Sequence, residues 1–275
     1  HVSLWGLLIP IRRSFDQYVS LRPARLLPGI ESPLAPSRDA LDVVIVRENT
    51  EGEYSEVGGR LFAGQPGEIA IQEAVFTRVG IERIARYAFE LAGTRTGRVA
   101  SATKSNGIVH TMPFWDEVVD EVAKDYPDVE LTRFHVDALA ALLVLDPGRF
   151  DVILGSNLFG DILSDLAAAL VGSIGIAPCG NIDPTRRNPS MFEPIHGSAH
   201  DITGKGLANP LASILSAALL LDISFGLKKE SETIINAVDA LLKKGFRTRD
   251  IADANTSANM ILGTEAIGEE ILKLI

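Results

Sequence analysis

Two carboxylates lie four residues apart in the stretch GDILSDL, at Asp161 and Asp165, inside a run that otherwise looks like a buried helix. Side chains at positions i and i+4 share one face of a helix, so these two groups repel each other unless a cation lies between them. Mg²⁺ and Mn²⁺ prefer oxygen ligands and take only a few of them from protein. The alternative is negative charge near a helix N-terminus, with Ser156 or Asn157 as the cap. The spacing alone leaves both interpretations open.

Arginines arrive from three places in the chain. Arg47 ends the apolar run DVVIVR, and Arg12 and Arg22 flank a short element in LLIPIRRSFDQYVSLRP. A guanidinium group binds a planar carboxylate through two parallel hydrogen bonds. Three such groups suit a substrate with more than one carboxylate, whereas each arginine taken singly is more consistent with a surface salt bridge or a solvated side chain.

Three further residues have the types needed for proton transfer or metal binding. Lys104 ends a strand-like run and enters a Ser-Asn-Gly turn, where burial would lower its pKa toward the range of a base. Tyr54 follows the polar turn after Arg47, and Asp137 precedes an apolar helix. A solvated lysine, a packing aromatic and a simple N-cap are the structural alternatives.

The stretch 192–222 is rich in Gly, Ser and His and runs into an apolar helix. Small residues let the backbone approach a ligand closely, so we interpret its first part as a ligand-binding loop. The dinucleotide fingerprint G-x-G-x-x-G is absent from it.

Strand and helix patterns alternate around these motifs, which predicts an α/β fold. The predicted strands are 42–47, 68–76, 98–103, 129–134 and 151–156. The predicted helices are 79–92, 113–125, 209–225, 230–244 and 256–274, and loops are predicted at 28–40 and 178–190.

Composition excludes several classes of protein. The chain of 275 residues has a formal net charge of −10, which argues against a nucleic-acid or anionic-membrane binder. No apolar run reaches the length of about 18 residues that spans a membrane. A single cysteine, Cys179, forms no disulfide within the chain and favours a reducing compartment, the cytoplasm.

Together these stretches resemble the β-decarboxylating dehydrogenases, the family of isopropylmalate, isocitrate, tartrate and D-malate dehydrogenases. GDILSDL looks like the family's metal-binding helix, and FEPIHGSAHDITGKGLANP looks like its NAD-binding loop. RENTEGEYS, FDQYVSLRP, YAFELA and SATKSNG are most similar to the tartrate and D-malate branch. The resemblance implies an isopropylmalate dehydrogenase-like two-domain fold and a homodimer with shared active sites.

The resemblance also assigns roles to the candidate residues. It implies that Arg12, Arg22 and Arg47 clamp the substrate, that Tyr54 and Lys104 are the catalytic acid and base, and that Asp161, Asp165 and Asp137 bind the metal. In the family, the counterparts of Lys104 and Asp137 come from the partner subunit. The implied cofactors are NAD and Mg²⁺ or Mn²⁺, with K⁺ as a further candidate.

The implied cofactor-binding residues are His196, Gly197, Ser198, Ala199, Asp201 and Asn209. Asp201 would accept hydrogen bonds from the adenosine ribose and repel a 2′-phosphate, so NAD is expected rather than NADP. His200 stands where the family commonly has Pro, which is a departure within this loop.

The implied reaction is oxidative decarboxylation of a small 2-hydroxy dicarboxylate, D-malate or tartrate. Alternatives are 3-isopropylmalate as substrate, or a non-catalytic subunit or fragment of the family. The segment 5–11 should line the pocket for the substrate's substituent, and its lack of Ser and Asn counts against isocitrate. We expect a small domain over 18–171 and a large, NAD-binding domain over 1–17 and 172–275. Relatives carry strand–helix units upstream of the first residue, so the large domain is expected to be incomplete at its N-terminus.

Overall fold

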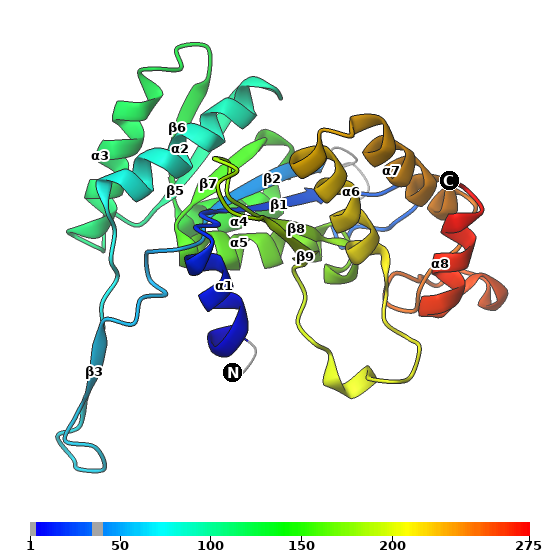
Figure 1. Cartoon of the computed structure of the whole chain (residues 1–275), viewed down its shortest axis with the longest axis horizontal. Coiled ribbons are helices and arrows are strands. Elements are labelled where there is room, and N and C mark those ends of the chain that lie inside the picture. The colour runs from blue at the N-terminus through cyan, green and yellow to red at the C-terminus, as the bar shows by residue number, and fades with distance from the viewer. Residues whose placement is uncertain (1–3, 35–40) are drawn as a thin grey trace.

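The computed structural model describes residues 4–34 and 41–275, and its centre is one mixed sheet of seven strands (Figure 1). The strand order across the sheet is β6-β5-β7-β2-β1-β8-β9. The strands are β1 Val19–Arg25, β2 Asp42–Glu48, β5 Arg98–Thr103, β6 Glu130–His135, β7 Val152–Gly155, β8 Pro178–Ile182 and β9 Met191–Pro194. Strands β2, β7, β5 and β6 pair in parallel, whereas β1 pairs antiparallel with both β2 and β8, and β8 pairs antiparallel with β9. The α/β prediction is therefore confirmed.

Helices cover the two faces of this sheet. A π-helix, Leu4–Leu8, leads into the first of eight α-helices of the described chain. These are α1 Ile9–Ser14, α2 Arg78–Gly93, α3 Thr111–Ala123, α4 Val136–Leu145, α5 Asn157–Leu170, α6 Leu211–Phe225, α7 Lys228–Lys243 and α8 Thr264–Leu272. Helices α2 and α5 both start at a hydroxyl cap, where Thr77 accepts from the amide of Gly80 and Ser156 accepts from that of Phe159.

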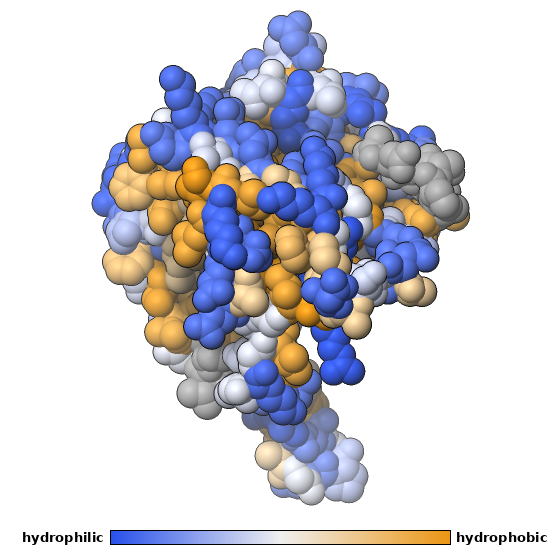
Figure 2. Space-filling view, turned by 90° about the vertical axis from the view of Figure 1, so that its right-hand side faces the viewer, coloured by the Kyte–Doolittle hydropathy of each residue, from blue (hydrophilic) through white to orange (hydrophobic). Residues whose placement is uncertain are grey.

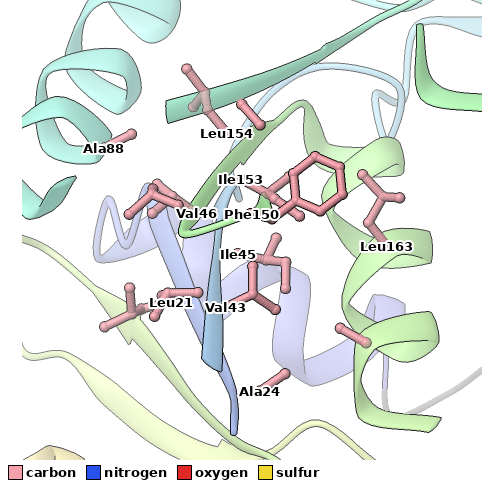
Figure 3. Close-up of a cluster of buried hydrophobic side chains, with 14 of the residues drawn as sticks. Leu21, Ala24, Val43, Ile45, Val46, Ala88, Phe150, Ile153, Leu154 and Leu163 are labelled. Atoms are coloured by element: carbon pink, nitrogen blue, oxygen red, sulfur yellow. The ribbon is translucent and has the colours of Figure 1, made fainter. Parts of the chain in front are cut away.

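The core follows from side-chain alternation along β2 and β7. Ile45 is directed toward α5 and Val46 toward α2, where Leu163 and Ala88 pack against the sheet (Figure 3). Because Arg47 lies two residues after Ile45, it is on the α5 face. The alternation of this strand therefore decides which helix the arginine meets.

A buried carboxylate fastens the start of β7 to the turn before β5. Asp151 is 2% exposed and accepts hydrogen bonds from Arg95 Nε at 2.6 Å and from the amide of Thr96 at 2.8 Å. Burial raises the pKa of Asp151, but the bonds from Thr96 and Arg95 outweigh this and hold the pKa below its usual range. The carboxylate is thus a fixed charge that holds two neighbouring strands in register.

A two-stranded arm extends away from the body (Figure 1). It consists of β3 Gly58–Leu61 and β4 Ile69–Gln72, and all eight of these residues are exposed. Figure 2 shows the arm below the body, and apolar residues gathered in patches among hydrophilic ones on the viewed face. The strand predicted at 68–76 therefore exists only over 69–72, and it lies outside the core.

Other predicted elements need correction. The loop predicted at 178–190 is wrong for its first residues, which form the buried strand β8; its Pro, Gly and Asn residues conceal this. Strands β1 and β9 were not predicted, since β1 contains a proline and two arginines. The helix predicted at 256–274 is restricted to α8, after a 3₁₀ turn at Ala258–Met260. Part of the loop predicted at 28–40 falls on residues 35–40, outside the described residues.

The sheet runs without interruption from β1 and β2 to β8 and β9, and so across residue 172. The division into 18–171 and 1–17 with 172–275 stays a prediction. In the described part of the chain, every helix is too short or too polar to cross a membrane.

Candidate active site

The sheet's α5 face places polar side chains from four strands side by side. In the antiparallel register, Ser20 of β1 lies opposite both Arg47 of β2 and Asn181 of β8. Cys179 of β8 lies opposite Glu193 of β9. Directly opposed residues point to the same face, so these polar groups form one surface.

A cavity of about 450 Å³ lies over this surface. One wall is the N-terminal helix segment with Arg12, and the other is the start of α5 with Asp161. The loop after β9 closes a third side. The lining residues are Leu4, Leu7, Leu8, Ile9, Arg12, Arg13, Arg22, Arg47, Asn49, Thr50, Tyr54, Asn157, Asp161, Cys179, Glu193, Pro194, Ile195, His196, Gly197 and Ser198.

Asp161 accepts hydrogen bonds from three side chains of the cavity. Its Oδ1 accepts from Arg22 Nη1 at 3.0 Å and from Arg47 Nη1, and its Oδ2 accepts from the Tyr54 hydroxyl at 2.9 Å. Burial raises the pKa of Asp161, but the positive charges of Arg47 and Arg22 outweigh it and hold the pKa below its usual range. The carboxylate is therefore ionised near neutral pH.

Arg47 is almost fully buried, at 2% exposed. Its Nε and Nη2 both donate to Asn157 Oδ1, at 3.1 and 2.6 Å. Burial, followed by repulsion from Arg22, lowers the pKa of Arg47 to about 9, so the group remains charged near neutral pH. Asn157 thus fixes the plane of the guanidinium in the cavity wall.

The close approach of α5 to Arg47 requires a glycine at position 160. A Cβ built there would lie 2.5 Å from the Cβ of Arg47 and 3.1 Å from its Cα. Any larger residue would push the helix start away from β2. Gly160 therefore sets the distance between Arg47 and the neighbouring Asp161.

Glutamates fasten the loop that delivers Tyr54. Glu53 accepts from Ser156 Oγ at 2.7 Å and from the amide of Leu158 at 3.0 Å, which ties the loop to the first turn of α5. Glu51 accepts from the amide of Thr77 at 2.9 Å, at the start of α2. Because the loop is held at both helix starts, the phenol of Tyr54 is held against Asp161. Burial and then the charge of Asp161 raise the pKa of Tyr54, so the phenol keeps its proton.

The third arginine of the cavity has a different partner. Arg12 Nη2 donates to Glu193 Oε1 at 3.1 Å, and Asn181 Nδ2 donates to the same oxygen at 2.8 Å. The structure thus brings all three predicted clamp arginines to one cavity, together with Tyr54 and Asp161.

Lys104 and Asp137 lie elsewhere within the chain. Lys104 Nζ donates to Asp137 Oδ1 at 2.6 Å, and neither residue lines the cavity. The Asp137 side chain is 68% exposed. The hydrogen bond from Lys104 lowers the pKa of Asp137 below its usual range. One chain therefore does not bring its own Lys104 to Tyr54.

Asp165 follows Asp161 by one turn of α5, as predicted, and is exposed. Among the described residues its carboxylate has no hydrogen bond or ion pair. Desolvation, followed by the negative charge of Asp161, raises the pKa of Asp165, opposite to the shift at Asp161. No group of three His, Cys, Asp or Glu side chains in residues 4–34 and 41–275 is arranged to hold a metal ion. Asp161 lines the cavity and Asp165 does not. Their carboxylates suit a hard divalent cation only as part of a larger ligand set that includes a further oxygen.

The predicted cofactor residues separate into two groups. His196, Gly197 and Ser198 line the cavity, whereas Ala199, Asp201 and Asn209 do not. Asn209 Oδ1 accepts from the amide of Leu211, the first residue of α6, at 2.9 Å. The prediction of a loop beginning at 192 is corrected, because Phe192 to Pro194 belong to β9.

Six polar lining residues are not among the predicted site residues: Arg13, Asn49, Thr50, Asn157, Cys179 and Glu193. Glu193 lies in the stretch FEPIHG, which the sequence predicts as part of a cofactor loop, and the sequence indicates Asn157 only as a helix cap. For Cys179 and Glu193 the missing signal is register across antiparallel strands, which the sequence does not reveal because β8 and β9 are themselves not predicted.

Comparison with known proteins identifies the family of this chain. A probable tartrate dehydrogenase/decarboxylase of Bacillus subtilis is 53% identical over 274 residues, which cover 100% of this chain and 76% of that protein. The D-malate dehydrogenase (decarboxylating) of Escherichia coli is 48% identical over 281 residues, with the same coverage of 100% and 76%. The crystal structure of an isocitrate dehydrogenase from Methylococcus capsulatus superimposes with a TM-score of 0.88 at 35% identity, covering 98% of this chain and 76% of that one. The family model for isocitrate/isopropylmalate dehydrogenase matches residues 3–271, and the chain belongs to that family.

Proposed function

We propose that this protein catalyses the NAD- and divalent-metal-dependent oxidative decarboxylation of a small 2-hydroxy dicarboxylate, D-malate to pyruvate and CO₂, tartrate, or both. The relatives indicate a decarboxylating dehydrogenase. The observation that carries the proposal is one cavity in which three arginines face a phenol and an ionised aspartate. That donor set matches a dianion that must lose CO₂ and then gain a proton.

Substrate recognition falls to the arginines. Arg12, Arg22 and Arg47 enter the cavity from three elements, so they can hold two carboxylates at different positions. Arg22 and Arg47 are buried and already fixed by partners, which limits the rearrangement needed on binding.

Asp161 and Asp165, with Asp137 of the partner subunit, would hold Mg²⁺ or Mn²⁺. Such an ion draws electron density from the substrate oxygens and so favours both oxidation and loss of CO₂. K⁺ is a further candidate, for which the described residues offer no distinct site.

The loop after β9 would hold the dinucleotide, and NAD accepts the hydride. Asp201 is exposed in that loop, free to accept from ribose hydroxyls and to repel a 2′-phosphate. NAD is therefore the proposed cofactor.

Two side chains would move protons. Lys104 of the partner subunit takes the substrate's hydroxyl proton, and Tyr54 gives a proton to the carbon that CO₂ leaves. The raised pKa of Tyr54 keeps the phenol protonated until that step. One proton is removed and one is returned, so the conversion of D-malate and NAD⁺ to pyruvate, CO₂ and NADH is balanced.

A homodimer would supply the missing groups. The exposed apolar side chains Leu145 of α4 and Ile162 of α5 are 63% and 56% exposed and suit a partner surface better than water. The division into a small domain over 18–171 and a large domain over 1–17 and 172–275 belongs to the same proposal.

A second candidate substrate is 3-isopropylmalate. Leu4, Leu7, Leu8 and Ile9 line one side of the cavity, and such a wall suits an apolar substituent. No Ser or Asn comes from this segment, which disfavours a third carboxylate such as that of isocitrate.

Turnover of matched substrates tests the proposal. The purified protein, supplied with Mn²⁺ and NAD, should form NADH from D-malate or meso-tartrate with a higher kcat/KM than from 3-isopropylmalate or isocitrate. NADH formation from 3-isopropylmalate alone would assign the second candidate, and no NADH from any of the four acids would refute the proposal.

A further inference from the structure

Arg12 differs from the other two arginines of the cavity in what it contacts. Arg22 and Arg47 reach Asp161, whereas Arg12 pairs with Glu193 through Nη2. The side chains of Arg12 and Glu193 are 9% and 24% exposed, so the pair is shielded from water. A charge-assisted hydrogen bond in such a place is stronger than one at the surface.

The contact uses half of one edge of the guanidinium. Nε and Nη2 form the edge that a planar carboxylate binds with two parallel hydrogen bonds. Glu193 takes Nη2 alone, and Arg12 Nε is buried without a hydrogen-bond partner among the described residues. A substrate carboxylate that binds this edge with both oxygens therefore needs the position that Glu193 holds.

Glu193 is itself held in place by neighbouring amides. Asn181 Nδ2 donates to Glu193 Oε1 at 2.8 Å, and Asn49 Nδ2 donates to Asn181 Oδ1 at 3.0 Å. Asn181 is fully buried and Asn49 lines the cavity. When Arg12 binds the substrate instead, Glu193 still accepts the hydrogen bond from Asn181. The exchange therefore does not leave the carboxylate of Glu193 without a hydrogen-bond partner.

We propose that Glu193 is a built-in competitor for the substrate: it occupies Arg12 in the ligand-free protein, and a dicarboxylate binds by taking Arg12 from it. This inference rests on the proposed function for the identity of the ligand, and on the Arg12–Glu193 contact for the exchange. Glu193 thereby acts as a specificity-determining residue. A ligand with one carboxylate is served by Arg22 and Arg47, and only a second carboxylate can displace Glu193 from the third arginine.

The exchange also couples the substrate clamp to the cofactor loop. Glu193 lies in β9, whose last residue is followed directly by the lining residues Ile195, His196, Gly197 and Ser198. Loss of the hydrogen bond to Arg12 removes one of the interactions that hold the end of β9 in place. By linkage, a ligand that binds the loop would change the affinity for the dicarboxylate by a certain factor. The dicarboxylate would then change the affinity for that ligand by the same factor.

Calorimetric titration without dinucleotide tests the exchange. Succinate and D-malate are titrated into the wild-type protein, into Glu193→Gln, and into the control Asp239→Asn. The control breaks the Arg25–Asp239 ion pair, at 2.9 Å, which lies away from the cavity. Glu193→Gln should bind both acids about five- to tenfold more tightly, because a neutral partner replaces a charged one at Arg12. Asp239→Asn should bind them like the wild type.

Equal or weaker binding by Glu193→Gln would overturn the proposal and would instead make Glu193 a support for Arg12. A second measurement on the wild-type protein remains decisive if that variant fails to fold: succinate should accelerate hydrogen–deuterium exchange over 191–198, and unchanged exchange there would also overturn it. A protein that binds neither acid overturns it as well. Tighter succinate binding by Glu193→Gln, together with no turnover of D-malate or meso-tartrate by the wild-type protein, refutes the proposed function alone. Normal turnover by the wild-type protein without tighter binding by the variant refutes this inference alone.

Discussion

Mixing two inactive variants should restore activity if the active site is shared between chains. Lys104→Ala removes the proposed base and Tyr54→Phe removes the proposed acid, so each homodimer should be inactive. In a heterodimer of the two variants, C2 symmetry places both lesions in one site and neither in the other. Each heterodimer should then have about half the activity of a wild-type dimer.

The geometry within one chain is the reason to expect this sharing. Tyr54 donates to Asp161 at 2.9 Å in the cavity, whereas Lys104 pairs with Asp137 at 2.6 Å and does not line that cavity. Random reassociation of equal amounts gives heterodimers as about half of all dimers, so the mixture should reach about one quarter of wild-type activity.

The assay uses chains that carry two different affinity tags, dissociated, mixed and purified through both tags. NADH formation from D-malate is measured at saturating NAD and Mn²⁺, and the control is a heterodimer of the Lys104→Ala/Tyr54→Phe double variant with wild-type chains, which should be inactive because each shared site then carries one lesion. A doubly purified heterodimer of the single variants that stays inactive would show that Lys104 and Tyr54 act from the same chain, and the shared-site account would fail.

Three further changes give distinct expected results. Asp165→Asn should reduce kcat/KM at low Mn²⁺ by about 100-fold or more while leaving Tm unchanged, because the charge serves only the metal; retained activity would refute the metal assignment. Asp201→Lys combined with His200→Ala should raise the ratio of NADP to NAD turnover by about tenfold or more, and a wild-type protein that prefers NADP would contradict it. Asp151→Asn should cost about 2–4 kcal/mol in the free energy of unfolding at pH 7, since it breaks a buried pair with Arg95. The depressed pKa of Asp151 means that this contribution is present above pH 4 and is lost as the pH falls through the folded-state pKa, so denaturant titrations of both proteins should converge there.

The strands that the sequence predicts well are the apolar parallel ones. β2, β5 and β7 each contain a run of aliphatic or small residues that is buried on both faces, and such runs are recognisable without tertiary information. β1 is not predicted because it contains two arginines, which are untypical of a buried strand. Their role becomes visible only when α5 and β8 lie beside them.

Some residues of the candidate site could likewise be predicted from the sequence, and others could not. Asp161 and Asp165 could be predicted from helical spacing, which is a local property. Glu193 could not, because its contact with Arg12 spans 181 residues and depends on the pairing of β8 with β9. The pairing of Lys104 with Asp137 was equally hidden, since it joins the end of β5 to the start of α4.

The most direct test of the proposed reaction is the stoichiometry of its products. Purified protein is incubated with D-malate, NAD and Mn²⁺, and NADH, CO₂ and pyruvate are measured in the same reaction. Oxidation coupled to decarboxylation predicts that all three form in equal amounts. NADH accompanied by oxaloacetate without CO₂, or the absence of all three products, would contradict it.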